Sequence, residues 1–343
     1  TVVVATAFNT LIGPRGWLNL ILMGLFHLTE PPLRLLNSLP AILLAHVFYN
    51  TSIVIRMVGN SLTRLNPHFD EAARVLGATS WRVFREVSLP LLMPSILGAT
   101  LLVFLFDFTS FGVVLMLGGP QYATVEVEIY NQAMNRFNLP MAGLLSIIQL
   151  AITLLITLLQ NRVNNPRFGK AALSSERKTL IKPKTKLQKT YVVLLSLLVL
   201  ILFVSPILSL VSRSLVTMEA ARGERGEVQT GFTLRYYSEL FHNRTGSVFY
   251  ANPLAAIRNS LIFSFLTLLI ATTLGLISAY ALANSGKSTR FLEPLFILPL
   301  GASAVILGLG FVISFNHAPW TSGRFPILIP IAHALIALPF VVR

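Results

Sequence analysis

Asp107 and two histidines are the side chains in this sequence whose chemistry could act within an apolar environment. Asp107 is the one acid well inside an apolar stretch, where a buried charge is costly and usually functional. It could attract a cationic solute along a membrane path, or accept a hydrogen bond from Thr109, Ser110 or another helix. His46 and His333 allow the same two roles. We favour the hydrogen-bonding role and keep all three as candidate path residues.

Metal and nucleotide chemistry have little support in the sequence. The chain has no cysteine, which excludes disulfides and thiolate metal sites, and no compact histidine–glutamate spacing typical of zinc. The segment Ala281–Ser288 resembles a permissive phosphate-binding loop, but such a loop must follow a strand and open a helix. This segment ends an apolar stretch instead, and Lys287 is better explained as a cytoplasmic charge. We therefore predict no catalytic residue, metal or cofactor.

The polar segment 62–94 has the residues of two short helices joined at a glycine. Asn66 can cap the first helix, with Pro67 in its first turn. Gly77 can end it, since glycine adopts a left-handed conformation at little cost. A hydroxyl at Thr79 or the next residue can cap a second helix. The sequence therefore predicts a helix–glycine–helix unit.

The second helix of this unit carries two large aromatic side chains, Trp81 and Phe84, three residues apart on one face. Such a pair could anchor the unit in a partner protein, or it could pack against the chain's own apolar helices. Both alternatives remain open at this stage. An ordinary pair of amphipathic helices on the membrane surface has the same pattern.

Composition indicates that these elements stand on a membrane-embedded scaffold. Of the 343 residues, 54% are apolar and only 12% are charged, about half the charged share of a soluble domain. A membrane helix needs about 20 apolar residues. Eight candidate spans meet or approach this length: a partial one at Thr1–Ile12, then Leu39–Val58, Ser95–Leu117, Leu139–Gln160, Tyr191–Val211, Asn259–Ala283, Leu295–Phe315 and Phe325–Val342.

The distribution of basic residues predicts the orientation of these spans. Asn161–Lys189 carries nine basic residues and one acid, and Arg56–Pro94 carries five arginines. Basic loops stay in the cytoplasm, so both segments are expected there. Ser214–Ala255, with four basic and four acidic residues, is expected outside. The net charge of +14 is explained by the same rule, so we predict no nucleic-acid partner.

An internal repeat indicates two homologous halves. Ala45–Arg56 and Ala332–Arg343 both read Ala-His, an apolar run, and Arg ten residues after the histidine. We expect residues 1–160 to be the C-terminal part of a first half and 161–189 a basic linker. Residues 190–343 are then the N-terminal part of a second half, cut before its own polar loop. An intact protein of this plan would have about 12 spans.

The polar loop resembles the cytoplasmic signature of ABC importer permeases, the membrane subunits of ATP-driven, binding-protein-dependent importers. That signature reads Glu-Ala-Ala, three residues, Gly, nine residues, Ile, one residue, Leu-Pro. The corresponding residues here are Glu71, Ala72, Ala73, Gly77, Val87 in place of Ile, Leu89 and Pro90. Beyond the loop, Phe108–Gly112, Gly118–Pro120 and Glu126–Tyr130 are similar to fused two-half permeases for thiamine and ferric iron.

The resemblance implies a fold, a function and partners. The fold would be an all-α, polytopic bundle of the type I importer class in the bacterial inner membrane. The loop would couple the spans to an ATPase subunit, expected as a homodimer, with Glu71 and Arg74 making polar contacts. An extracytoplasmic binding protein would deliver the solute. Ferric iron or thiamine is expected, a polyamine or sulfate less so, and an ion-coupled secondary transporter is the alternative function.

Overall fold

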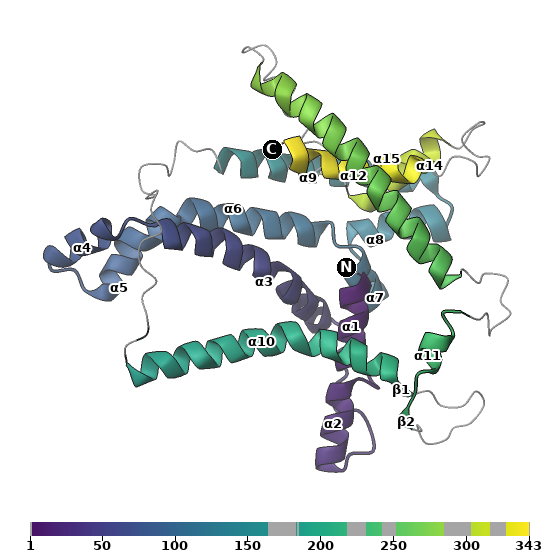
Figure 1. Ribbon diagram of the computed structural model, residues 1–343, viewed down its shortest axis with the longest axis horizontal. Coiled ribbons are helices and arrows are strands. Elements are labelled where there is room, and N and C mark those ends of the chain that lie inside the picture. Colours follow the sequence, from purple (N-terminus) through teal and green to yellow (C-terminus); the bar gives the residue numbers. More distant parts are fainter. Residues whose placement is uncertain are drawn as a thin grey trace. The chain divides into compact units, whose positions relative to one another are not determined.

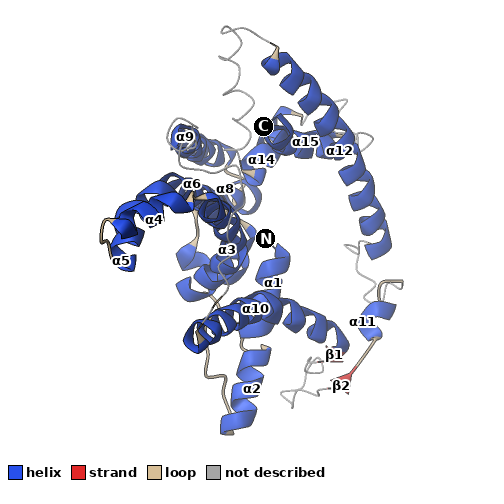
Figure 2. Ribbon diagram, turned by 60° about the vertical axis from the view of Figure 1, so that its left-hand side comes forward, coloured by secondary structure: helices blue, strands red, loops and turns tan. Residues whose placement is uncertain are grey.

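The computed structural model describes residues 2–163, 183, 185–217, 231–241, 252–284, 303–315 and 327–342. Nearly all of this part of the chain is helical (Figure 2), and the one sheet within it is a two-residue antiparallel pair. The elements are α1 (Val2–Ile12), α2 (Trp17–Phe26), α3 (Leu39–Arg64), α4 (Pro67–Val75), α5 (Ser80–Val83), a π-helix (Phe84–Ser88), α6 (Leu89–Phe108), α7 (Gly112–Leu117), a 3₁₀ turn (Pro120–Tyr122), α8 (Val125–Tyr130), a second π-helix (Asn131–Asn135), α9 (Leu139–Val163), α10 (Lys186–Leu215), β1 (Val216–Thr217), β2 (Gly231–Phe232), α11 (Arg235–Ser238), α12 (Pro253–Ala283), α14 (Ala304–Ser314) and α15 (Leu328–Val342).

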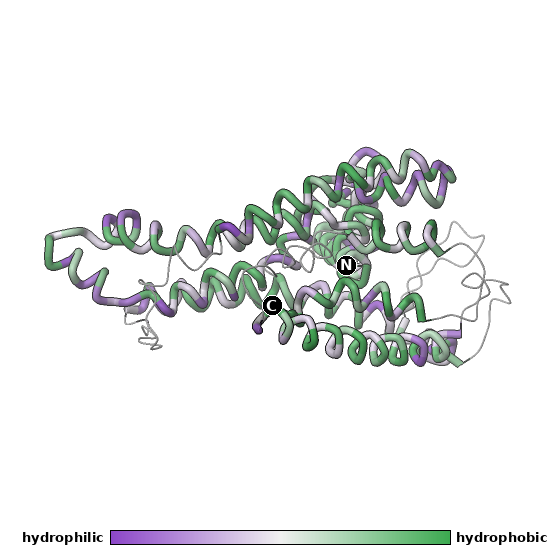
Figure 3. Tube along the Cα trace, turned by 90° about the horizontal axis from the view of Figure 1, so that it is seen from above, coloured by the Kyte–Doolittle hydropathy of each residue, from purple (hydrophilic) through white to green (hydrophobic). Residues whose placement is uncertain are grey.

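Five of the described helical segments are long and apolar enough to cross a membrane. Figure 3 shows hydrophobic residues over most of their length. These segments are Leu39–Arg64, Ser80–Phe108, Leu139–Gln160, Lys186–Leu215 and Pro253–Leu282. The apolar helices α14 and α15 are shorter, and they lie in the last two predicted spans, whose first residues are outside the described part. The predicted all-α, membrane-spanning class is therefore confirmed.

One predicted span has the wrong boundaries. The sequence placed a span at Ser95–Leu117, whereas a continuous helical segment runs from Ser80 to Phe108. The chain breaks at Thr109–Phe111 before the separate helix α7. The predicted span began after Pro94, but the helix also includes the apolar residues Leu89–Pro94, because neither Pro90 nor Pro94 breaks it.

The chain forms two compact units that do not follow the predicted halves. The first comprises residues 1–124 and 155–210, and the second comprises residues 125–154 and 211–343. Each unit takes residues from both predicted halves. Compactness does not test descent from a duplication, so the two-half plan stays a prediction. Most of the predicted linker, and Arg343 of the repeat, lie outside the described residues.

In the first unit, small and aromatic side chains bring α1, α3 and α10 together. Ala5 on α1 and Ala45 on α3 are fully buried, which permits close helix packing. The Phe48 ring lies 5.6 Å from that of Phe8 and 5.1 Å from that of Phe203 on α10. Within this unit α1 and α2 run across the direction of α3, α6 and α10 (Figure 1).

In the second unit, α12 packs lengthwise on α15, and α8 packs on α14. Gly275 makes the first contact close: an added Cβ would lie 2.6 Å from Cβ of Val341. The second contact has a buried core of Ile129, Ala133, Ala142 and Leu309, which joins α8, the second π-helix, α9 and α14. The first is a close packing contact between two apolar helices, as expected inside a membrane.

Candidate functional site: a surface hairpin and a polar cluster

Residues Leu65–Ser88, here called the surface hairpin, join the ends of α3 and α6. Its first helix, α4, begins as predicted: the Asn66 side chain accepts a hydrogen bond from the backbone N–H of His68 at 3.1 Å. Pro67 occupies the first turn, where its missing N–H costs nothing. The second helix, α5, also begins as predicted, with Thr79 accepting a bond from the N–H of Arg82.

Gly77 ends α4 in a left-handed conformation, with φ of +86°. The N–H of Ala78 donates to the carbonyl of Ala73 at 3.0 Å, and the N–H of Gly77 to that of Arg74 at 2.9 Å. These two bonds form a Schellman motif, which satisfies the last carbonyls of the helix. The predicted role of Gly77 as the turn residue is therefore explained by backbone geometry.

The two arms of the hairpin are joined at its base. Ser88, 8% exposed, donates a hydrogen bond from its hydroxyl to Asp70 of α4 at 3.2 Å. Val83, also on the second arm, is buried. Neither Ser88 nor Val83 was predicted from the sequence. A hydroxyl 18 residues from an acid gives no sequence signal for such a bond.

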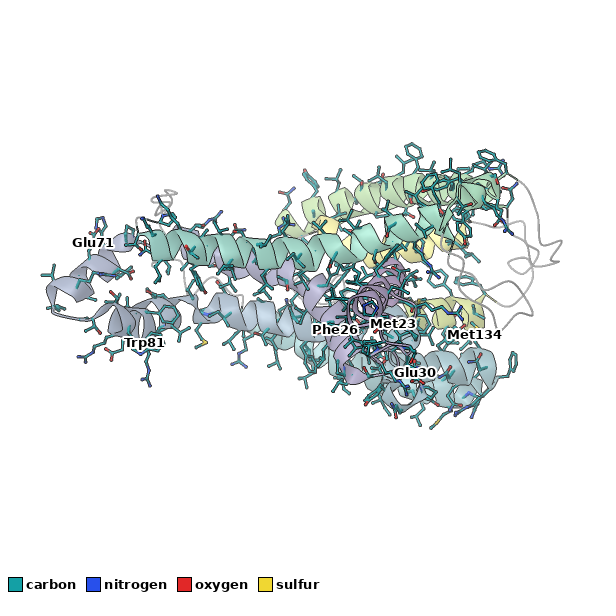
Figure 4. All side chains as sticks on the ribbon, turned by 90° about the horizontal axis from the view of Figure 1, so that it is seen from below. Met23, Phe26, Glu30, Glu71, Trp81 and Met134 are labelled. Carbon is teal, nitrogen blue, oxygen red and sulfur yellow. The ribbon has the colours of Figure 1, made fainter. Side chains whose placement is uncertain are left out.

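Apolar side chains are displayed on the outer part of the hairpin. Val75 and Leu76 are 87% and 88% exposed, and Trp81 is 70% exposed. The rings of Trp81 and Phe84 lie 5.7 Å apart on one face of the second arm. Figure 4 shows Glu71 on one arm and Trp81 on the other. Both rings are exposed in the described part of the chain, and their role as an anchor for a partner protein stays a prediction.

The other residues of the signature differ in how far their side chains are exposed. Glu71 is exposed and lies 3.2 Å from the His68 ring nitrogen Nδ1. Ala72 and Arg74 are exposed, and Ala73 is half-buried against the turn. Val87 and Leu89 are half-buried.

Pro90 does not break the helix, contrary to what a Leu-Pro pair suggests. A proline within an α-helix clashes with the carbonyl four residues earlier, here Glu86. The π-helix at Phe84–Ser88 widens the turn at this point, and the N–H of Leu89 donates to the carbonyl of Phe84. The second arm of the hairpin therefore continues directly into α6.

A second group of polar side chains, the polar cluster, joins α3 to the C-terminal end of α6. Asn50 donates from Nδ2 to Oδ1 of Asp107 at 2.6 Å, and the His46 ring nitrogen Nδ1 lies 3.5 Å from the same oxygen. The other ring nitrogen of His46 bonds the hydroxyl of Ser110 at 2.9 Å. Asn50 is 4% exposed and is a residue the sequence analysis missed. Thr109 bonds its own helix at Leu105.

The interhelical bond that the sequence allowed for Asp107 is therefore present, with Asn50 as its donor. A role for Asp107 and His46 in a translocation path stays a prediction. His333 belongs to the other unit, where its side chain is exposed on α15. Among the described residues no group of three histidines or acids could hold a metal ion.

Glu126 is a buried acid that the sequence analysis quoted but did not single out. It is 1% exposed at the start of α8, and it accepts hydrogen bonds from Gln149 of α9, the Ser303 hydroxyl and the Val305 N–H. Ser303 also caps α14 by accepting a bond from Ile306 N–H at 3.1 Å. The Glu126 carboxylate therefore sits at the N-terminus of α14, where the helix dipole favours an anion.

A family of known proteins matches the part of the chain that contains the surface hairpin. Residues 3–170 match the family described as binding-protein-dependent transport system inner membrane component. Residues 3–170 belong to this family. This inner-membrane permease family accounts for the all-α fold, the long apolar helices and the surface hairpin between two of them. No solved structure matches the chain.

Several individual relatives are also similar. The thiamine transport system permease protein ThiP of Haemophilus influenzae is 27% identical over 308 residues, which is 89% of this chain and 53% of that protein. ThiP of Brucella suis is 26% identical over 98% of this chain and 57% of its own length. The putative 2-aminoethylphosphonate transport system permease protein PhnU of Salmonella typhi is 29% identical over 45% of this chain and 53% of its own length. The chain thus spans about half the length of the relatives it matches.

Proposed function

We propose that the chain is part of the membrane permease of an ATP-driven importer. The observation that carries this proposal is the surface hairpin of a family member: a fixed turn at Gly77, an exposed apolar anchor at Trp81, and direct continuity with α6. A rigid element of this kind can transmit a movement of a docked partner into the spans.

The partner of the hairpin is an ATPase subunit, present as a homodimer, and an extracytoplasmic binding protein delivers the solute. Trp81 enters an apolar groove of the ATPase, because tryptophan is among the residues that supply most of the energy of protein interfaces, and Leu76 lies beside it in the contact. Glu71 and Arg74 make polar contacts with the ATPase, and Ala72 and Ala73 permit its close approach. Gly77 forms the turn. The junction between the hairpin and α6 is formed by Val87, Leu89 and Pro90.

The orientation follows from the basic residues. The hairpin and the 161–189 segment face the cytoplasm of a bacterium, and the first residues of α3 face outward. The permease itself carries no catalytic residue or cofactor, and the ATPase hydrolyses ATP.

Thiamine is the solute that the comparisons favour. The two ThiP proteins align with 89% and 98% of this chain, whereas PhnU aligns with 45%. Ferric iron, predicted beside thiamine from the sequence, has less direct support, because the relatives described above are named for thiamine or 2-aminoethylphosphonate.

The test is ATP-driven uptake into proteoliposomes that contain the full-length permease, its ATPase and its binding protein. Radiolabelled thiamine should accumulate with ATP and not with an ATPase variant that cannot hydrolyse it. Uptake driven by a proton or sodium gradient without ATP would establish the secondary-transporter alternative. ATP-driven uptake of 2-aminoethylphosphonate in place of thiamine would overturn the substrate and leave the importer function standing.

A further inference from the structure

Helix α2 displays an apolar stripe that no function described above uses. Leu18, Ile21 and Leu25 recur at helical spacing and are 37%, 60% and 69% exposed. Phe26 at the end of the helix is 61% exposed. The opposite side of α2 is turned toward the rest of the chain, and Asn19 on that side is fully buried. The stripe is therefore one continuous face of the helix.

The stripe is held in place by a polar contact at Asn19. Its Nδ2 donates to the carbonyls of Gly13 and Leu33, each at 2.8 Å, and its Oδ1 accepts from the Leu33 N–H at 2.9 Å. This side chain ties the helix to the turn before it and to the segment that returns to α3. Because its one strongly polar residue is used in this way, α2 has no polar group left for its exposed face.

The surroundings of the stripe are those of a lipid–water boundary. The ten residues of α2 include no charged side chain, whereas Arg15 precedes the helix and an exposed ion pair, Glu30 with Arg34 at 2.8 Å, follows it. The helix runs across the direction of α3 and α6 (Figure 1), and Figure 4 looks along its axis.

We propose that α2 lies in the interface of the outer lipid leaflet, with its stripe in the acyl region and its flanking charges among the headgroups. The outer side rests on the orientation proposed above. Interfacial helices bury their apolar face by about 5–10 Å in this way. The start of the span that follows also displays apolar side chains, since Leu39 and Leu43 on α3 are 47% and 51% exposed.

A soluble binding protein is the other occupant that could cover the stripe. Docking surfaces for soluble partners carry a polar rim around an apolar centre. They must also remain soluble between encounters, which disfavours a large uncovered apolar face. The exposed side of α2 lacks such a rim over its whole length, and hydrocarbon is available to it at all times. Lipid is therefore the occupant that the charge pattern favours.

Site-directed spin labelling tests this proposal, because the chain contributes no cysteine of its own. Single cysteines would replace Ile21 or Leu25 in the full-length permease, without its ATPase, in lipid nanodiscs. Two matched leucines serve as controls: Leu43 on α3 for lipid, and Leu76 on the surface hairpin, 88% exposed, for water. Each label is scored by its accessibility to molecular oxygen relative to a water-soluble nickel chelate.

We expect the logarithm of that ratio to be positive at Ile21 and Leu25, as at Leu43, and negative at Leu76. A negative value at either α2 position overturns the proposal. Adding the purified binding protein should leave both α2 values unchanged. Loss of nickel accessibility on that addition, from an initially negative value, would establish protein docking instead. Neither result depends on the transported solute, so failure here is distinct from failure of the importer function.

Discussion

Replacing Gly77 should weaken the docking of the surface hairpin by a calculable amount. Gly77 has φ of +86°, and nothing lies within 4 Å of where a Cβ would stand. The cost of a larger residue is therefore backbone strain alone, about 1–2 kcal/mol for a left-handed non-glycine residue. If docking requires this turn, Gly77→Val should lower the affinity for the ATPase about 5- to 30-fold.

The assay is equilibrium binding of the labelled ATPase to the full-length permease in nanodiscs, with insertion and expression checked for each variant. Gly77→Asn should retain more affinity than Gly77→Val, because asparagine tolerates the left-handed region. Gly59→Val is the matched control, since Gly59 also has no neighbour within 4 Å but lies inside helix α3. Affinity for Gly77→Val within about twofold of both the wild type and this control would refute the reasoning, because 1 kcal/mol corresponds to more.

Three further predictions concern contacts inside the described units, each measured as melting temperature in detergent. The Asp107→Asn variant should melt near the wild type, because its amide oxygen can still accept the hydrogen bond from Asn50. Asp107→Leu lacks this acceptor and should lose about 0.6–1.7 kcal/mol of folding stability. Reduced uptake by a stable Asp107→Asn variant would instead support a role in the translocation path. Glu126→Leu should melt well below Glu126→Gln, since each buried donor left without an acceptor costs about 1–3 kcal/mol; equal melting would contradict this. Gly275→Leu should destabilise the α12–α15 contact, and Val341→Ala should partly restore it; no rescue would mean that the two side chains do not meet.

The features that the sequence predicted well are local in the chain. Asn66 and Gly77 act on backbone groups within a few residues of themselves, so their types alone indicate a cap and a turn. The apolar spans were predictable for a similar reason, because a membrane imposes a length on each.

The features that the sequence missed depend on distant partners. Asn50 donates a hydrogen bond to Asp107, which lies 57 positions later in the sequence. Glu126 accepts a hydrogen bond from Ser303, which is still more distant in the sequence. No periodicity or spacing links such residues, and a single sequence gives no record of paired changes. The continuous helix at Pro90 was not predictable for a different reason: the turn that accommodates the proline is a π-helix, which propensities do not specify.

The unbroken helical path through Pro90 has a mechanical consequence. Residues Ser80–Phe108 form one segment of 29 residues, about 43 Å long at 1.5 Å per residue. Pivoted at one end, such a lever moves its other end by about 0.75 Å for each degree of tilt. A tilt of about 5° imposed at Trp81 would thus shift Asp107 by about 4 Å, more than the length of its bond to Asn50. The first arm cannot act in this way, since the chain leaves the helical conformation between Arg64 and Pro67. A torque applied at the surface hairpin would therefore reach the far end of α6 through one arm only.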